Sequence, residues 1–217
     1  MRTFTRFLFA TGVTASDLSG AVPSVSGIRF DGLPKAVDRD VVQALLASCE
    51  LDRPTGRRDY AILLLMVRLG LRAVEIARME LGDIGWRAGE IEIKSKGGRR
   101  DRLPLPGDVG QALADYLVQG RRASSCRSVF LAAAGEPVGM SRNAVVFVSR
   151  TASERAGIAV VGGHRLRHTA GTELLRAGAS LREVGEVLRQ SDRMTTSIYA
   201  KIDERSLRLA ARPWPKG

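Results

Sequence analysis

Apolar residues recur with the spacing of buried helices along most of this chain. The most apolar segment spans residues 57–69, contains an unbroken apolar run at 61–67 and stops at Gly70. The pattern predicts further helices at residues 2–11, just after 33–35, and at 71–77, 107–120 and 141–157. No apolar run reaches the roughly 20 residues that a membrane-spanning helix needs, so we expect no membrane insertion.

Residues 81–105 alternate apolar and polar side chains with the period of a strand. Segments 81–86, 90–94 and 101–105 are predicted strands, and Glu90-Ile91-Glu92-Ile93 shows the alternation most clearly. Ser95-Lys96-Gly97-Gly98 has the composition of a turn between the second and third strands. The sequence therefore predicts a mainly α fold with a small antiparallel three-stranded β-sheet, an α+β class.

Composition adds a partner to this picture. The chain has 217 residues, enough for one good-sized core, and a net charge of +11, which is typical of proteins that bind a polyanion. A second interpretation stays open, because arginine far outnumbers lysine, as in proteins encoded by GC-rich genomes. Cys49 and Cys126 are isolated, which suits a reducing cytoplasm and argues against structural zinc. We expect neither a metal nor a cofactor.

Residues 164–199 carry the candidate chemistry. His164 and Arg167 would lie on one face of the first turn of a helix that begins after Gly162-Gly163, where free backbone N–H groups favour a phosphate. Tyr199 follows in a polar segment behind Thr195-Thr196. A histidine, an arginine and a tyrosine in a polar context indicate phosphoryl transfer to a tyrosine hydroxyl.

This pattern resembles the tyrosine recombinase (phage integrase) family. Three stretches carry the resemblance, in the order that the family shows. They are Gly70-Leu71-Arg72-Ala73-Val74-Glu75-Ile76, the hairpin block from Ser95-Lys96-Gly97-Gly98 to Leu105, and a last block made of His164-Arg165-Leu166-Arg167-His168, Gln190-Ser191-Asp192 and Thr195-Thr196-Ser197-Ile198-Tyr199.

The resemblance implies roles for the basic residues. Arg72 and Arg167 would bind the two non-bridging oxygens of the scissile phosphate, since the planar guanidinium gives two parallel hydrogen bonds and stays charged. Lys96 would protonate the departing 5′ oxygen. Without the resemblance, Arg72 is equally a surface residue paired with Glu75 along a helix, and Lys96 a solvated lysine.

The resemblance also assigns the remaining site residues. His164 would accept the proton of Tyr199, and Tyr199 would be the nucleophile that forms a 3′-phosphotyrosyl link. Gln190 stands where most members have histidine or tryptophan; it can donate a hydrogen bond but carries no charge, which favours reduced activity. We expect His168 to be structural, and the other tyrosines, Tyr60 and Tyr116, to be packing residues.

The family's organisation implies two parts. Residues 33–217 would form the catalytic domain, and residues 1–32 a remnant of the last helix of a separate DNA-clamping domain with its linker. An amphipathic helix at 204–211 and Trp214 would dock on a neighbouring subunit. The partners are then double-stranded DNA, further copies of the chain and a possible partner recombinase, in the bacterial cytoplasm.

The predicted function is a site-specific DNA recombinase or integrase that cleaves and rejoins strands. The alternative is a truncated or degenerate recombinase that only binds DNA. A regulator using a helix-turn-helix at residues 169–188, with its turn at Gly178-Ala179-Ser180, is a third reading, which does not need Arg72, Lys96 and Tyr199 to belong to one site. A topoisomerase would use the same chemistry as the recombinase.

Overall fold

A computed structural model describes residues 5, 8–17, 36–94 and 98–189. Chain contacts divide the protein into two units, Met1–Leu33 and Pro34–Gly217. In the first unit, residues 8–10 are helical, and Gly12 follows with a φ of 73° and donates its N–H to the Phe9 carbonyl. The predicted helix at the start of the chain therefore ends at Gly12, as its sequence indicates.

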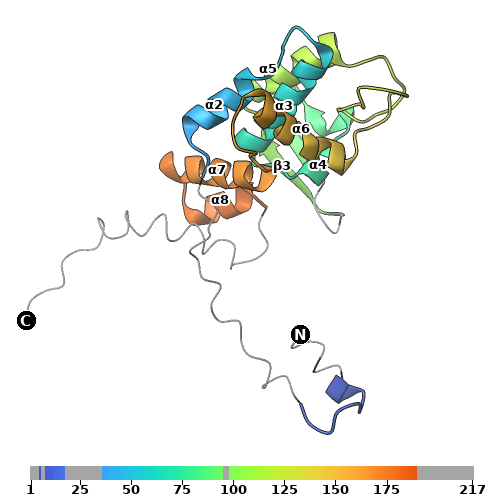
Figure 1. Ribbon diagram of the computed structural model, residues 1–217, viewed down its shortest axis with the longest axis vertical. Helices are drawn as coiled ribbons and strands as arrows, with labels where there is room; N and C mark the ends of the chain where they lie inside the picture. The colour runs from blue at the N-terminus through green and yellow to red at the C-terminus, as the bar shows by residue number, and fades with distance from the viewer. Residues whose placement is uncertain (1–4, 6–7, 18–35, 95–97, 190–217) are drawn as a thin grey trace, which may run out of the picture. The chain divides into compact units, whose positions relative to one another are not determined.

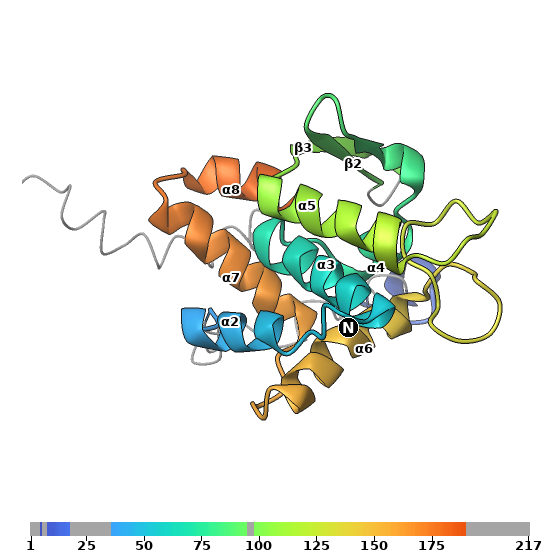
Figure 2. The ribbon, with the colours of Figure 1, turned by 90° about the horizontal axis from the view of Figure 1, so that it is seen from above.

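Helix α3, Pro54–Arg68, lies at the centre of the second unit (Figures 1 and 2). Pro54 occupies its first turn, where the missing N–H costs nothing. The run from Ala61 to Met66 is buried on every side, as expected of a helix without a polar face. Around α3 pack α2 (Arg39–Ala47), α4 (Ala73–Ala77), α5 (Gly107–Asp115), the π-helix η5 (Tyr116–Gly120), α6 (Arg142–Arg155) and α7 (Gly163–Arg176).

The sheet has three antiparallel strands in the order β1-β2-β3. β2 (Glu90–Lys94) pairs with β3 (Arg100–Pro104) so that Ile91 faces Leu103, and the buried side chains of both join the core around α3. On the other face the Arg100 guanidinium lies 2.6 Å from the Glu92 carboxylate. The alternation of buried and charged positions thus matches the period that predicted these strands.

The predicted strand at 81–86 is wrong in its first half. Residues Leu81–Asp83 form a 3-10 turn, η3, and only Ile84–Gly85 form β1. The cause is Asp83, whose carboxylate accepts a hydrogen bond of 2.8 Å from the Glu80 N–H and closes the turn. The predicted helix at 107–120 is helical throughout: α5 runs to Asp115, and the π-helix η5 follows it.

Helices α7 and α8 (Leu181–Val187) form a helix-turn-helix, as the sequence predicts. Gly178 adopts a φ of 95° after the end of α7, a conformation that side chains disfavour. Ser180 then caps α8, since its hydroxyl accepts from the Glu183 N–H while the Glu183 carboxylate accepts from the Ser180 N–H. The predicted class, mainly α with a three-stranded antiparallel sheet, is confirmed.

The helices of the described residues are short or carry charged side chains. None of their helices combines the length and the apolar character that crossing a bilayer requires.

Candidate functional site

Arg72 lies at the N-terminal cap of α4, directly after the turn that ends α3. Its side chain is 45% exposed and its Nη1 donates to Oε1 of Glu75 over 2.9 Å, while the Glu75 Oε2 accepts the Arg72 backbone N–H over 2.8 Å. The pairing of these residues along the helix is therefore present. Glu75, however, is not a surface residue, because its side chain is only 4% exposed.

Arg167 is fixed by the same turn. Helix α7 begins at Gly163 with Gly162 as its cap, and Arg167 is buried on it. Its Nη1 donates to the carbonyl oxygen of Gly70, two residues before Arg72. Gly70 has a φ of 58°, and a Cβ atom there would lie 2.6 Å from Cδ2 of Leu188. The positive φ and the close approach of Leu188 both favour glycine at this point, where the end of α3 meets the helix-turn-helix.

The two histidines differ in exposure although their rings touch. The centroids are 4.8 Å apart at an interplanar angle of 88°, with His164 exposed and His168 buried. Burial lowers the pKa of His168, and the nearby His164 and Arg167 lower it further. His168 thus favours the neutral form and packs inside, which agrees with its predicted structural role, whereas the exposed His164 ring is accessible from solvent.

Arg189 also contacts Glu75, although the sequence did not predict it as a site residue. Its side chain is 1% exposed, and its Nη2 lies 2.9 Å from Oε2 of Glu75, a residue 114 positions earlier in the chain. Its Nη1 donates to the carbonyl of Val187 over 2.8 Å. No local signal could have found it, because the contact joins a residue just after α8 to α4 across 114 positions.

The predicted site residues Lys96, Gln190 and Tyr199, together with the tail at 204–214, lie outside the described residues. Just before Lys96, the strand residue Lys94 places its Nζ 2.9 Å from Glu80 and 3.3 Å from Asp83. The hydrogen bond to Glu80 raises the pKa of Lys94, which is held by carboxylates rather than available for an anion. Of the six predicted site residues, the structure places Arg72, His164 and Arg167.

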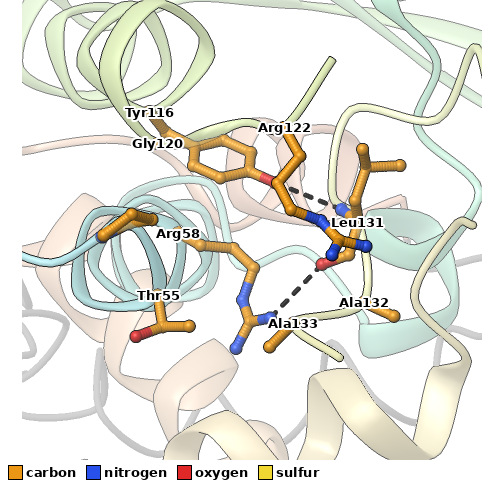
Figure 3. A pocket seen from close by; sticks show the side chains of 9 residues that line it. Thr55, Arg58, Tyr116, Gly120, Arg122, Leu131, Ala132 and Ala133 are labelled. Carbon is orange, nitrogen blue, oxygen red and sulfur yellow. Dashed lines mark hydrogen bonds between the residues drawn. The ribbon is translucent and has the colours of Figure 1, made fainter. Parts of the chain in front are cut away.

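Metal-ligand groups and cavities can be located within the described ranges. No three His, Cys, Asp or Glu side chains in residues 36–94 and 98–189 group as metal ligands would. A cavity of about 320 Å³ lies between α2, α3 and α7, and one of about 50 Å³ lies beside Tyr116 (Figure 3). Tyr116 itself is a packing residue, as predicted: it stacks on Phe130 and its hydroxyl accepts the Leu131 N–H.

The chain belongs to the phage integrase family, whose model matches residues 35–205. A putative integrase/recombinase of Sinorhizobium fredii, y4rA, is 43% identical over 99% of this chain and 53% of its own length. The tyrosine recombinase XerD of Ralstonia nicotianae is 35% identical over 85% of this chain and 62% of its own length. The chain thus spans roughly half to three-fifths of these relatives.

Solved structures show the same fold. The XerA recombinase superposes with a TM-score of 0.72 at 20% identity, over 98% of this chain and 75% of that one. The integrase of mycobacterium phage Brujita gives a TM-score of 0.61 at 26% identity, over 94% of this chain and 65% of that one. XerH, bound to its palindromic difH substrate in a post-cleavage complex, gives a TM-score of 0.68 at 22% identity, over 85% of this chain and 54% of that one.

Proposed function

We propose that this chain is a site-specific DNA recombinase whose catalytic domain, residues 33–217, cleaves and rejoins DNA strands through a covalent bond to Tyr199. One observation supports this most. Arg167 donates a hydrogen bond to Gly70, which lies 97 residues earlier in the chain. This bond holds the helix of the His-x-x-Arg-His block against the turn that precedes Arg72. Two arginines from separate sequence blocks thus have their backbones beside the same turn. This arrangement is suitable for binding a single phosphate.

The proposed reaction is an in-line transfer at the scissile phosphate. The Tyr199 Oη atom attacks phosphorus, its proton passes to His164, and the 5′ oxygen of the departing strand takes a proton from Lys96. Arg72 and Arg167 neutralise the charge that builds on the non-bridging oxygens, and Gln190 donates one further hydrogen bond. Because these cations supply the positive charge, we expect cleavage to continue in the presence of a metal chelator.

Double-stranded DNA is the proposed partner. The net charge of +11 favours a polyanion, and XerH is described with its difH substrate. Lambda integrase is described as a dimer on a core site and as a tetramer on a Holliday junction. We propose that copies of this chain also associate on DNA, through residues 203–217. Deleting these residues should abolish assembly on DNA, and unchanged assembly would remove the tail from this role.

The test uses DNA that flanks the gene of this protein, nicked near candidate crossover sites to trap intermediates. Wild type should form an SDS-resistant protein–DNA adduct, and Tyr199→Phe should form none while binding DNA with nearly the same affinity. An adduct formed by Tyr199→Phe would refute the assignment of the nucleophile. Salt-sensitive binding without any adduct would instead favour a protein that only binds DNA.

Gln190→His tests the remaining site residue. Histidine can donate a hydrogen bond and carry charge, so the variant should cleave faster if position 190 contacts the phosphate. An unchanged rate would place Gln190 outside the site.

A further inference from the structure

Arg189 is buried in a backbone conformation that arginine rarely adopts. Its φ is 51°, and within the described residues it is the one non-glycine residue with a positive φ. Such a conformation is unfavourable for an arginine and persists only where the surroundings impose it. Within the same described residues, its buried Nε has no hydrogen-bond partner. A helix end with glycine here would avoid both costs, so the side chain must contribute something else.

What the side chain contributes is a second positive charge on Glu75. The carboxylate accepts from Arg72 through Oε1 and from Arg189 through Oε2, each over 2.9 Å. We call Arg72, Glu75 and Arg189 the Glu75 cluster. Its charges sum to +1, whereas Glu75 with Arg72 alone would be neutral. A neutral pair attracts a phosphate less than a net positive group does, and the difference is large where the dielectric constant is low.

The two arginines of the cluster differ in solvent exposure. Arg189 is enclosed, at 1% exposure, while Arg72 is 45% exposed. Among the described residues, Arg72 donates from its side chain only through Nη1, to Glu75, which leaves Nε and Nη2 for a ligand. Glu75 thus orients Arg72, and Arg189 balances the charge of Glu75 from the buried side.

We propose that Arg189 is a positioning residue for Arg72: its buried charge holds Glu75 ionised and keeps the cluster net positive toward the scissile phosphate. This inference rests on the proposed function, because it takes Arg72 as a phosphate ligand.

The electrostatics of Glu75 support the same reading. Burial alone would raise the pKa of Glu75, but the charge of Arg189, followed by hydrogen bonds and the charge of Arg72, outweighs burial and holds the pKa below its ordinary value. Removing Arg189 removes the largest of the lowering influences.

The experiment compares full-length wild type with three variants at the cluster. Arg189→Met removes the charge and keeps the apolar stem, Arg189→Lys keeps the charge, and the double variant Glu75→Gln/Arg189→Met removes both charges. Arg58→Met is the matched control, since Arg58 is also nearly buried, at 12% exposure, pairs with Asp59 over 2.8 Å and donates to the Leu131 carbonyl (Figure 3).

Two readouts are used. Carboxyl NMR titration of the free protein should show a higher pKa of Glu75 in Arg189→Met than in wild type. The single-turnover cleavage rate at saturating protein should fall about tenfold or more in Arg189→Met, recover in part in Arg189→Lys and in the double variant, and stay within about twofold of wild type in Arg58→Met. A merely structural role would not produce recovery in the double variant.

The outcomes separate this inference from the proposed function. An unchanged Glu75 titration in folded Arg189→Met overturns the inference, as does an equal rate defect in Arg58→Met. If wild type forms no Tyr199-dependent adduct, the proposed function fails, and the titration together with the DNA affinity of each variant decides the inference. An affinity lowered in Arg189→Met and not in Arg58→Met then supports it, and equal affinities overturn it.

Discussion

Two clusters in this protein have the same charges and different surroundings. The Glu75 cluster joins one buried carboxylate to Arg72 and Arg189. The Asp59 cluster, formed by Arg58, Asp59 and Arg155, joins another buried carboxylate to two arginines, over 2.8 Å and 3.8 Å. Each cluster sums to +1. Charge alone therefore does not distinguish a site from a structural contact.

The two clusters differ in the hydrogen bonds that their arginines make outside the carboxylate. In the Asp59 cluster, Arg58 also donates to the Leu131 carbonyl and Arg155 to the Ser48 carbonyl, so both arginines tie backbone segments together. In the Glu75 cluster, within the part of the chain that the structure describes, the exposed Arg72 donates from its side chain only to Glu75, and the buried Arg189 adopts a left-handed backbone conformation. The first arrangement stabilises a junction, and the second presents a cation to solvent.

Replacing each acid by its amide tests this contrast with the largest expected effect. Glu75→Gln leaves Arg189 buried without a counter-charge, and an amide nitrogen replaces one of the two oxygens that each accept from an arginine, so unfolding should become easier by about 3–5 kcal/mol. Asp59→Asn keeps the Oδ1 atom that accepts both Arg58 hydrogen bonds, and should cost about 1–2 kcal/mol. Denaturant unfolding of both variants measures the difference; equal losses would contradict the contrast.

Removing the exposed arginine of each cluster should separate activity from stability. Arg72→Ala should slow strand cleavage by about 10²–10³-fold, the effect of losing one donor to a developing oxyanion, with little change in stability. Arg155 is 37% exposed and binds a carbonyl and a distant carboxylate, so Arg155→Ala should cost about 1 kcal/mol of stability and leave cleavage intact. Single-turnover kinetics and unfolding of both variants form the measurement. A cleavage defect in Arg155→Ala would remove the distinction between the clusters.

The sequence predicts the parts of this protein that local pattern controls. Apolar spacing predicts α3, and period-two alternation predicts the hairpin whose Ile91 and Leu103 are buried. The strand prediction fails at 81–83 because a single side chain, Asp83, closes a turn within an alternating segment. Alternation reports which face a residue occupies, and a 3-10 turn can produce the same order.

The candidate site is predictable to the extent that its residues are close in sequence. The spacing of Arg72 and Glu75 indicates their contact, but not that Glu75 is buried, because burial depends on residues distant in the sequence, such as Arg189. Arg189 meets Glu75 across 114 positions, and its left-handed backbone follows from how α8 ends. Neither feature has a signature in the sequence around position 189.

Acid should weaken the Glu75 cluster in a defined direction. The pKa of Glu75 is held below its ordinary value, about 4.3 for a free side chain, so its pairing stabilises the fold fully above that pH. This contribution is lost as the pH falls through the lowered value in the folded state, because the unfolded chain binds the proton more readily. Unfolding free energies measured from neutral to acid pH should therefore fall less steeply in Glu75→Gln than in wild type. Matching slopes would show that the carboxylate is not held ionised.

Thiol labelling should also distinguish the two clusters, and it is the smallest of the expected effects. Cys49 lies beside the Asp59 cluster, where burial raises its pKa to about 11, although Arg155 acts in the opposite direction. A hydrogen bond to Ser128 lowers the pKa of the partly exposed Cys126, so a thiol reagent near pH 7.5 should label Cys126 first and Cys49 only after opening of the fold. Arg155→Ala should speed labelling of Cys49, since it loosens that junction, and Arg72→Ala should not. Mass spectrometry of the labelled protein reads both sites in one experiment, and faster Cys49 labelling in Arg72→Ala would show that the two clusters are mechanically coupled rather than separate.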